Sequence, residues 1–131
     1  MTRRRVLVID DSKLLHKVYD VSLRCYPRAT FDVTYANNGK EGFAHLAEHP
    51  DIELIILDIN MPVMGGLEFL RECKHARETW GIPVIIASTQ GDTEQMNVAL
   101  RSGAKAYLKK PFTPDQLHTL LDEILATASR S

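Results

Sequence analysis

The chain has 131 residues, of which 44% are hydrophobic and 25% charged, and its net charge is -1. This composition is typical of one globular domain and excludes disordered, collagen-like and low-complexity chains. The balanced charge argues against direct nucleic-acid binding, and the basic run at residues 3–5 is interpreted as solvated. No membrane span or signal-peptide core is present. With only Cys25 and Cys73, a disulfide framework is excluded, so we expect two buried free thiols and a cytoplasmic location.

Five short apolar runs are predicted to be strands. Three of them are continuously apolar, which is typical of strands covered on both faces in a parallel sheet. The second run alternates more and is predicted to lie at an edge of the sheet. The runs are residues 6–9, 31–36, 54–57, 84–87 and 106–108.

A helical pattern follows each run. The first helix carries four apolar residues on one face and ends at Pro27; they are Leu14, Val18, Val21 and Cys25. The next three helices are predicted to begin at the capping box of residues 38–41, after residues 65–66 and after Asp92. Met96, Ala99 and Leu100 are expected to face inward from the fourth helix. The fifth has the clearest start, with Thr113 as cap, Pro114 at the first helical position and Gln116 as box partner.

The alternation of strand and helix, repeated five times, predicts one α/β domain with an open, doubly wound parallel sheet and helices on both faces. We expect a single domain over residues 1–131, with a core at about 5–126.

Polar residues follow four of the five runs, where ligands bind in sheets of this kind. They are Asp10 and Asp11, Asp58, Ser88 and Thr89, and Lys109 and Lys110. Three carboxylates close together repel one another strongly unless a cation or a proton lies among them, and oxygen ligands favour Mg²⁺ over zinc. The alternative is that each Asp only caps the turn or helix that follows it.

The sequence resembles the receiver domain of two-component response regulators. The matching motifs occur in family order between residues 6 and 112: Asp10-Asp11, then Asp58 with Met61-Pro62 and Gly65-Gly66, then Ser88, then Gly103-Ala104, Tyr107-Leu108 and Lys110-Pro111-Phe112. Ser88 lies 30 residues after Asp58, and Lys110 lies 22 residues after Ser88, as in the family.

The resemblance implies a flavodoxin-like sheet of order 2-1-3-4-5 and a phosphoacceptor at Asp58. It implies that Asp11, Asp58 and the backbone carbonyl of Asn60 hold Mg²⁺, with Mn²⁺ as a substitute, while Asp10 acts through bound water. Lys110, rather than Lys109, would pair with Asp58 and then with the phosphoryl group.

The resemblance also implies a switch. Ser88 would hydrogen-bond the phosphoryl group, Thr89 would offer its backbone N–H, and Tyr107 would rotate inward. Asn60 and Gln90 occupy the positions that tune hydrolysis. The implied partners are a sensor histidine kinase or phosphotransfer protein and a downstream protein target, with no membrane partner. The chain is expected to be a monomer or a weak, phosphorylation-dependent dimer.

Several alternatives stay open. A haloacid-dehalogenase-like phosphatase requires Asp-x-Asp, whereas Asn60 stands at the second position. A flavin carrier requires a phosphate-binding loop after the first strand, where Asp10 and Asp11 would repel phosphate. The remaining readings are a degenerate receiver that only binds proteins and the receiver fragment of a longer regulator.

The histidines are predicted to be solvated, without metal-ligand spacing and away from the acidic residues. They are His16, His45, His49, His75 and His118.

Overall fold

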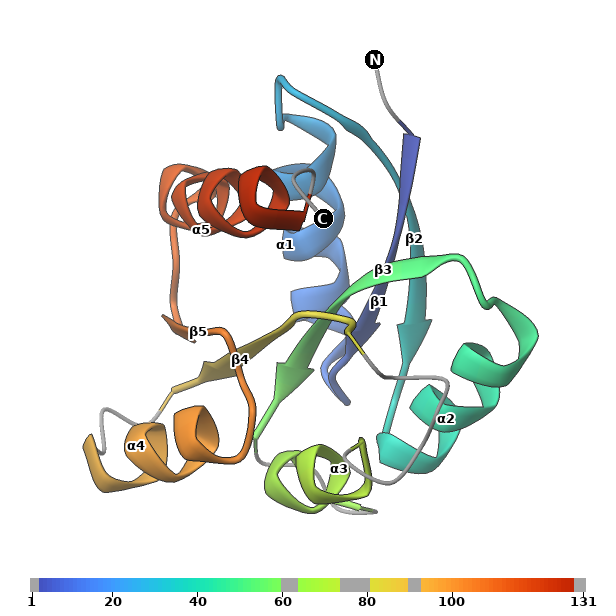
Figure 1. The fold of residues 1–131 in the computed structure, drawn as a ribbon. Helices are drawn as coiled ribbons and strands as arrows, with labels where there is room; N and C mark the ends of the chain where they lie inside the picture. The colour runs from blue at the N-terminus through green and yellow to red at the C-terminus, as the bar shows by residue number, and fades with distance from the viewer. Residues whose placement is uncertain (1–2, 60–63, 74–80, 90–92, 129–131) are drawn as a thin grey trace.

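The computed structural model describes residues 3–59, 64–73, 81–89 and 93–128, which form five strands and five helices in strict alternation (Figure 1). The strands are β1 Arg3–Ile9, β2 Thr30–Ala36, β3 Ile52–Asp58, β4 Val84–Ser88 and β5 Ala106–Lys109. The helices are α1 Lys13–Arg24, α2 Gly39–Glu48, α3 Gly66–Cys73, α4 Thr93–Arg101 and α5 Pro114–Ala128. The strands form one parallel sheet of order β2-β1-β3-β4-β5, which confirms the predicted fold and the edge position of the second strand.

The sheet separates two apolar cores. Helices α1 and α5 cover one face, and α2, α3 and α4 cover the other (Figure 1). Alternate residues of each strand point to opposite faces, so Val6 and Val8 pack under α1 and α5, whereas Leu7 and Ile9 pack toward α2 and α3. This arrangement explains why the central runs are continuously apolar.

Two of the predicted helix starts are confirmed by their capping contacts. The Asn38 side chain accepts from the backbone N–H of Glu41 at 2.9 Å, and the Glu41 carboxylate accepts from the Asn38 amide at 3.2 Å. Thr113 and Gln116 form the equivalent pair at α5, with distances of 2.9 and 3.2 Å. Side-chain caps therefore fix where both helices leave the preceding loop.

The predicted apolar face of α1 is wrong. Its four members lie on the solvent side: Leu14, Val18 and Val21 have exposed fractions of 73%, 37% and 57%, and Cys25 is exposed. The residues that α1 buries are Tyr19, Ser22 and Leu23. Helix α1 carries two apolar stripes, and the bulkier one occupies the core because it removes more apolar surface from water.

Three further expectations need correction. Leu100 is 39% exposed on α4, although Ala99 is fully buried. Cys73 is half-buried, and both cysteines are free as predicted. The basic run belongs to β1 and is ion-paired: Arg3 meets Asp32 at 2.6 Å, Arg4 meets Glu53 at 3.6 Å, and Arg5 meets Asp51 at 3.0 Å. Within the described ranges, no helix combines the length and apolar character needed to cross a membrane.

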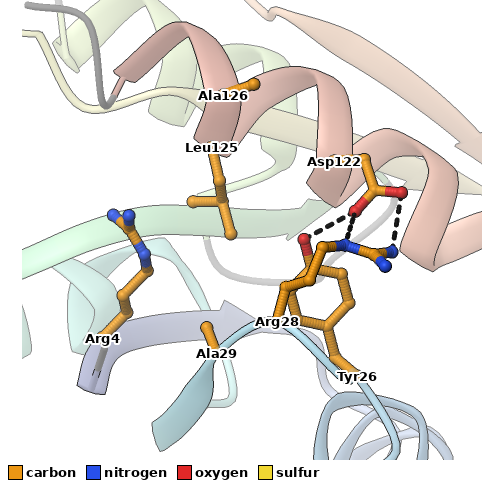
Figure 2. Close-up of a pocket in the computed structure, with 7 residues that line it drawn as sticks. All are labelled: Arg4, Tyr26, Arg28, Ala29, Asp122, Leu125 and Ala126. Atoms are coloured by element: carbon orange, nitrogen blue, oxygen red, sulfur yellow. Dashed lines mark hydrogen bonds and ion pairs between the residues drawn. The ribbon is translucent and has the colours of Figure 1, made fainter. Parts of the chain in front are cut away.

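A polar cluster joins the α1–β2 loop to α5 at the end of the sheet where the strands begin. Figure 2 shows Tyr26 and Arg28 converging on Asp122. The Tyr26 hydroxyl donates to Asp122 at 2.7 Å, and Arg28 donates through Nε at 2.6 Å and a terminal nitrogen at 2.8 Å. The hydrogen bonds from Tyr26 and then Arg28 hold the pKa of Asp122 below its usual 3.8.

This pKa predicts the acid behaviour of the Asp122→Asn variant. A depressed pKa in the folded state stabilises the fold fully above about pH 4, and the contribution is lost as pH falls through the folded value. We expect the variant to be less stable than the wild type at pH 7 and the difference to shrink by pH 3, as measured by urea unfolding. Tyr26→Phe, which removes one donor, should give a smaller difference of the same sign. An equal difference at both pH values would contradict the prediction.

Candidate functional site

The pairing register brings the predicted acidic residues to one edge of the sheet. Ile9 pairs with Leu57 across β1 and β3, so Asp10 and Asp58 are the next residues on these two adjacent strands. Asp58 in turn pairs with Ala87 of β4. Asp10 is 1% exposed and Asp58 7% exposed, so both carboxylates lie inside the protein surface.

Lys110 lies between these two carboxylates. Its Nζ is 2.7 Å from Oδ2 of Asp10 and 3.2 Å from Oδ1 of Asp58, and the side chain is only 5% exposed. Lys109 is exposed, so only one of the two lysines lies at this edge, as side-chain alternation predicts, and it is Lys110, as the resemblance implies. At these distances the Lys110 ammonium forms a buried ion pair with each of the two carboxylates.

The backbone holds this lysine in place through Ser88. The Lys110 N–H donates to the Ser88 carbonyl at 2.8 Å, and Ser88 pairs with Lys109 at the end of β5. Ser88 is fully buried at the end of β4, whereas Thr89 is exposed. A backbone hydrogen bond therefore connects Ser88, which carries the hydroxyl, to Lys110.

Asp10 also organises the start of α1. Its Oδ1 accepts from the backbone N–H of Ser12 at 2.9 Å, and the Ser12 hydroxyl caps the helix by accepting from Leu15 N–H at 3.2 Å. Capping thus accounts for one oxygen of Asp10, but its other oxygen contacts Lys110. The reading of Asp10 as a simple cap is therefore incomplete.

A third carboxylate joins the group. One oxygen from each of Asp10, Asp11 and Asp58 lies within 4.8 Å of the others, with Asp11 exposed. Together with Lys110, the formal charge of the cluster is −2, which one divalent cation balances. An all-oxygen donor set suits a hard ion such as Mg²⁺, so these residues fit the expected metal. Asn60, the remaining predicted ligand, lies outside the described residues.

Gly66, the first residue of α3, lies close to the backbone at the end of β3. The Gly66 N–H donates to the Ile59 carbonyl at 3.0 Å. A Cβ at Gly66 would lie 2.6 Å from the backbone oxygen of Asp58 and from Cα of Ile59, which is too close for any side chain. The second glycine of the sequence motif is therefore required for α3 to pack against the end of β3.

Tyr107 lies on β5, the outermost strand of the sheet beside β4, and is half-buried. It packs against the core on the α2–α4 side and lines a shallow groove of about 320 Å³. Lys109, Gln116, Thr119 and Leu120 of β5 and α5 line the same groove. Gln90 lies outside the described residues.

The histidine predictions are wrong in two respects. His16 adjoins the acidic cluster, because its Nε2 lies 2.6 Å from the Asp10 backbone oxygen and its ring stacks on Tyr35 at 4.6 Å. His45 and His49, four residues apart, lie with Glu48 close enough together to hold a metal ion. The described histidines are half-buried rather than fully solvated, and His75 lies outside the described residues.

Sequence reasoning also missed Tyr19. Its side chain is 1% exposed and packs on Phe112, with ring centroids 5.1 Å apart. Its hydroxyl is buried without a hydrogen-bond partner among the described residues. Burial, and then the negative charges of Asp10 and Asp58, raise the pKa of Tyr19 well above its usual range. The phenol is therefore neutral beneath the charged edge.

The strand order and the charged carboxyl edge define a flavodoxin-like α/β domain with an acidic site. The sequence matches the family model of the response regulator receiver domain over residues 6–122. It is 32% identical over 125 residues to a chemotaxis protein CheY homolog of Campylobacter jejuni, covering 95% of both chains. It is 32% identical over 124 residues to chemotaxis protein CheY1 of Helicobacter pylori, covering 94% of this chain and 98% of that protein.

A solved structure agrees with these sequence comparisons. The chemotaxis response regulator CheY4 of Vibrio cholerae has a TM-score of 0.82 and 29% identity, covering 94% of this chain and 99% of that chain. The chain belongs to the response regulator receiver domain family of two-component systems. The general function of the family is signalling through phosphorylation of an aspartate by a kinase, and its members generally bind Mg²⁺ at an acidic pocket. The family assignment removes the phosphatase and flavin-carrier alternatives.

The Tyr19 hydroxyl yields a stability prediction. A buried, unsatisfied polar group costs about 1–3 kcal/mol, so Tyr19→Phe is expected to raise the free energy of unfolding by about 1 kcal/mol. Urea unfolding at pH 7 measures the change. Tyr26→Phe is the matched comparison, because it removes a bonded hydroxyl and should lower stability. A loss of stability in both variants would show that Tyr19 is hydrogen-bonded in solution.

Proposed function

We propose that Asp58 is the phosphoacceptor of this receiver and that Asp10, Asp11, Ser88 and Lys110 support the transfer. The observation that carries the proposal is the buried Lys110 ammonium in contact with both Asp10 and Asp58. This contact pairs the Asp58 carboxylate, at the end of a central strand, with the ammonium of Lys110. A sensor histidine kinase or a phosphotransfer protein would be the donor.

The metal proposed for this site is Mg²⁺, with Mn²⁺ as a substitute. Asp11 and Asp58 would bind it directly, the Asn60 carbonyl would add a third ligand as the resemblance implies, and Asp10 would act through bound water. When bound, the ion supplies positive charge that offsets the negative charge of the carboxylates and the phosphoryl oxygens. The cluster charge of −2 supports this assignment.

The chain's own residues would position the transfer. An Asp58 carboxylate oxygen attacks phosphorus in line, an O–P bond forms, and the bond from phosphorus to the donor imidazole nitrogen breaks. The departing imidazole keeps the bonding electron pair and takes up a proton from solvent. Lys110 then exchanges its contact with Asp58 for one with a phosphoryl oxygen, while the Ser88 hydroxyl donates to another.

Phosphorylation would signal to a downstream protein by changing the α4–β5–α5 surface. The hydrogen bond between Lys110 N–H and the Ser88 carbonyl supports coupling between the phosphoryl site and the ends of β4 and β5. Tyr107 would move inward as Ser88 is drawn toward the phosphoryl group. The groove beside Tyr107, and with it the α4–β5–α5 surface, would then be presented differently to a downstream protein.

The remaining parts of the proposal concern the chain as a whole. Residues about 5–126 would form the core of one receiver domain, a phosphoacceptor rather than an enzyme with an external substrate, whose only chemistry is self-catalysed transfer and dephosphorylation. It would act in the cytoplasm as a monomer or a weak, phosphorylation-dependent dimer. It would work through protein contacts, either alone or as part of a longer regulator.

Asp58→Asn tests the phosphoacceptor directly. With acetyl phosphate and Mg²⁺ we expect the wild type to gain about 80 Da by mass spectrometry, the mass of one phosphoryl group with its charge of about −2. Asp58→Asn should gain nothing, because an amide cannot accept the group, and chelation of Mg²⁺ should abolish the gain in the wild type.

Asp32→Asn is the matched control, because Asp32 lies on the edge strand and pairs with Arg3 away from the site. It should be labelled like the wild type. Labelling of Asp58→Asn would refute the assignment of the phosphoacceptor. A wild type that is never labelled would favour the degenerate, protein-binding receiver.

A further inference from the structure

A second group of side chains that could hold a metal ion lies at the C-terminal end of α2, in its last turn and at its C-cap residue, His49. It consists of His45, Glu48 and His49, which occupy positions i, i+3 and i+4 and therefore lie on one side of the helix. One ligand atom from each residue lies within 4.8 Å of the other two. Both histidines are half-buried and Glu48 is exposed, so the group opens to solvent on one side.

His45 carries an unsatisfied polar atom. Its Nδ1 is buried and has no hydrogen-bond partner among the described residues. The His45 and His49 rings lie nearly parallel, with centroids 6.4 Å apart and an interplanar angle of 18°. A buried ring nitrogen without a partner is an unusual feature, and a missing ligand is one of its ordinary explanations.

The surroundings favour a cation. The group lies at the C-terminal end of α2, where backbone carbonyls lacking helical partners give the helix its negative pole. Glu48 adds a carboxylate.

We propose that His45, Glu48 and His49 form a binding site for one Zn²⁺ or similar transition-metal ion. Two imidazole nitrogens and one carboxylate oxygen are the donor set of three-ligand zinc sites, with bonds of about 2.0–2.2 Å. The three ligand atoms already lie within 4.8 Å of one another, and they would have to draw closer together to surround one ion at these bond lengths. Nitrogen donors favour Zn²⁺, Ni²⁺ and Cu²⁺ over Mg²⁺, so this site differs in selectivity from the acidic cluster.

The proposed site is independent of the phosphoacceptor. The α2 helix ends just before β3 begins at Ile52, whereas Asp58 is the last residue of β3. A strand of seven residues spans about 20 Å at 3.3 Å per residue, which separates the two sites by the length of the sheet. Three protein ligands leave a fourth position open to water.

Zinc titration of chelator-treated protein tests the proposal. The titration is followed by isothermal calorimetry with excess Mg²⁺ present to occupy the acidic cluster. We expect one Zn²⁺ per chain, and tighter binding of Cu²⁺ by the same site. His45→Asn and His49→Asn should each weaken Zn²⁺ more than tenfold, since loss of a residue behind a ligand already costs about 10–100-fold. Glu48→Gln should weaken it less, because an amide oxygen remains.

Two control variants make the result specific. His118→Asn removes a half-buried histidine on α5, and Asp58→Asn alters the acidic cluster; both should bind Zn²⁺ like the wild type. Circular dichroism establishes that each variant is folded. The proposal is overturned if the wild type shows no saturable Zn²⁺ binding, or if a folded His45→Asn/His49→Asn double variant binds as tightly as the wild type.

Discussion

The contact of the Lys110 ammonium with the carboxylates of Asp10 and Asp58 is the interaction on which the organisation of this molecule depends. All three side chains are nearly inaccessible to water, and an unpaired charge in such a place costs several kcal/mol. The ends of β1, β3 and β5 must therefore meet in one arrangement for the charges to be compensated. The same contact leaves a residual negative charge that favours a divalent cation and then a phosphoryl group.

The sheet order explains how residues one hundred positions apart reach this contact. Asp10 and Asp58 follow adjacent strands in register, while Lys110 comes from β5, with β4 lying between β5 and β3. A long, unbranched lysine can span that separation, and the hydrogen bond to the Ser88 carbonyl sets the position from which it starts. Phosphorylation would alter the partners of Lys110, so a change at Asp58 has a direct physical route to the β4 and β5 ends.

The sequence-based predictions were correct where a residue pattern is compatible with only one local structure. Continuous apolar runs and side-chain caps such as Asn38–Glu41 follow from local geometry, whereas the choice of Lys110 over Lys109 rested on the resemblance to the receiver family. The predictions failed on α1 because periodicity shows which residues share a face but not which face is inward. The stripe ending at Cys25 was chosen, whereas the core took Tyr19 and Leu23. They missed His16 for a related reason, since the chain alone does not reveal that the first turn of α1 folds back onto the Asp10 carbonyl.

The two proposed cation sites follow from opposite ends of the same βα units. At the carboxyl edge, strands end in Asp10 and Asp58, and the available donors are oxygens beside a lysine. At the other edge, His45 in the last turn of α2 and His49 at its C-cap lie at the negative pole of the helix, and the donors are mainly nitrogens. Hard and borderline ions prefer these donor sets in opposite order, so occupancy of one site does not require competition with the other. The separation along β3 keeps their fields apart as well, because charges about 20 Å away lie beyond the screening length of about 8 Å at physiological salt.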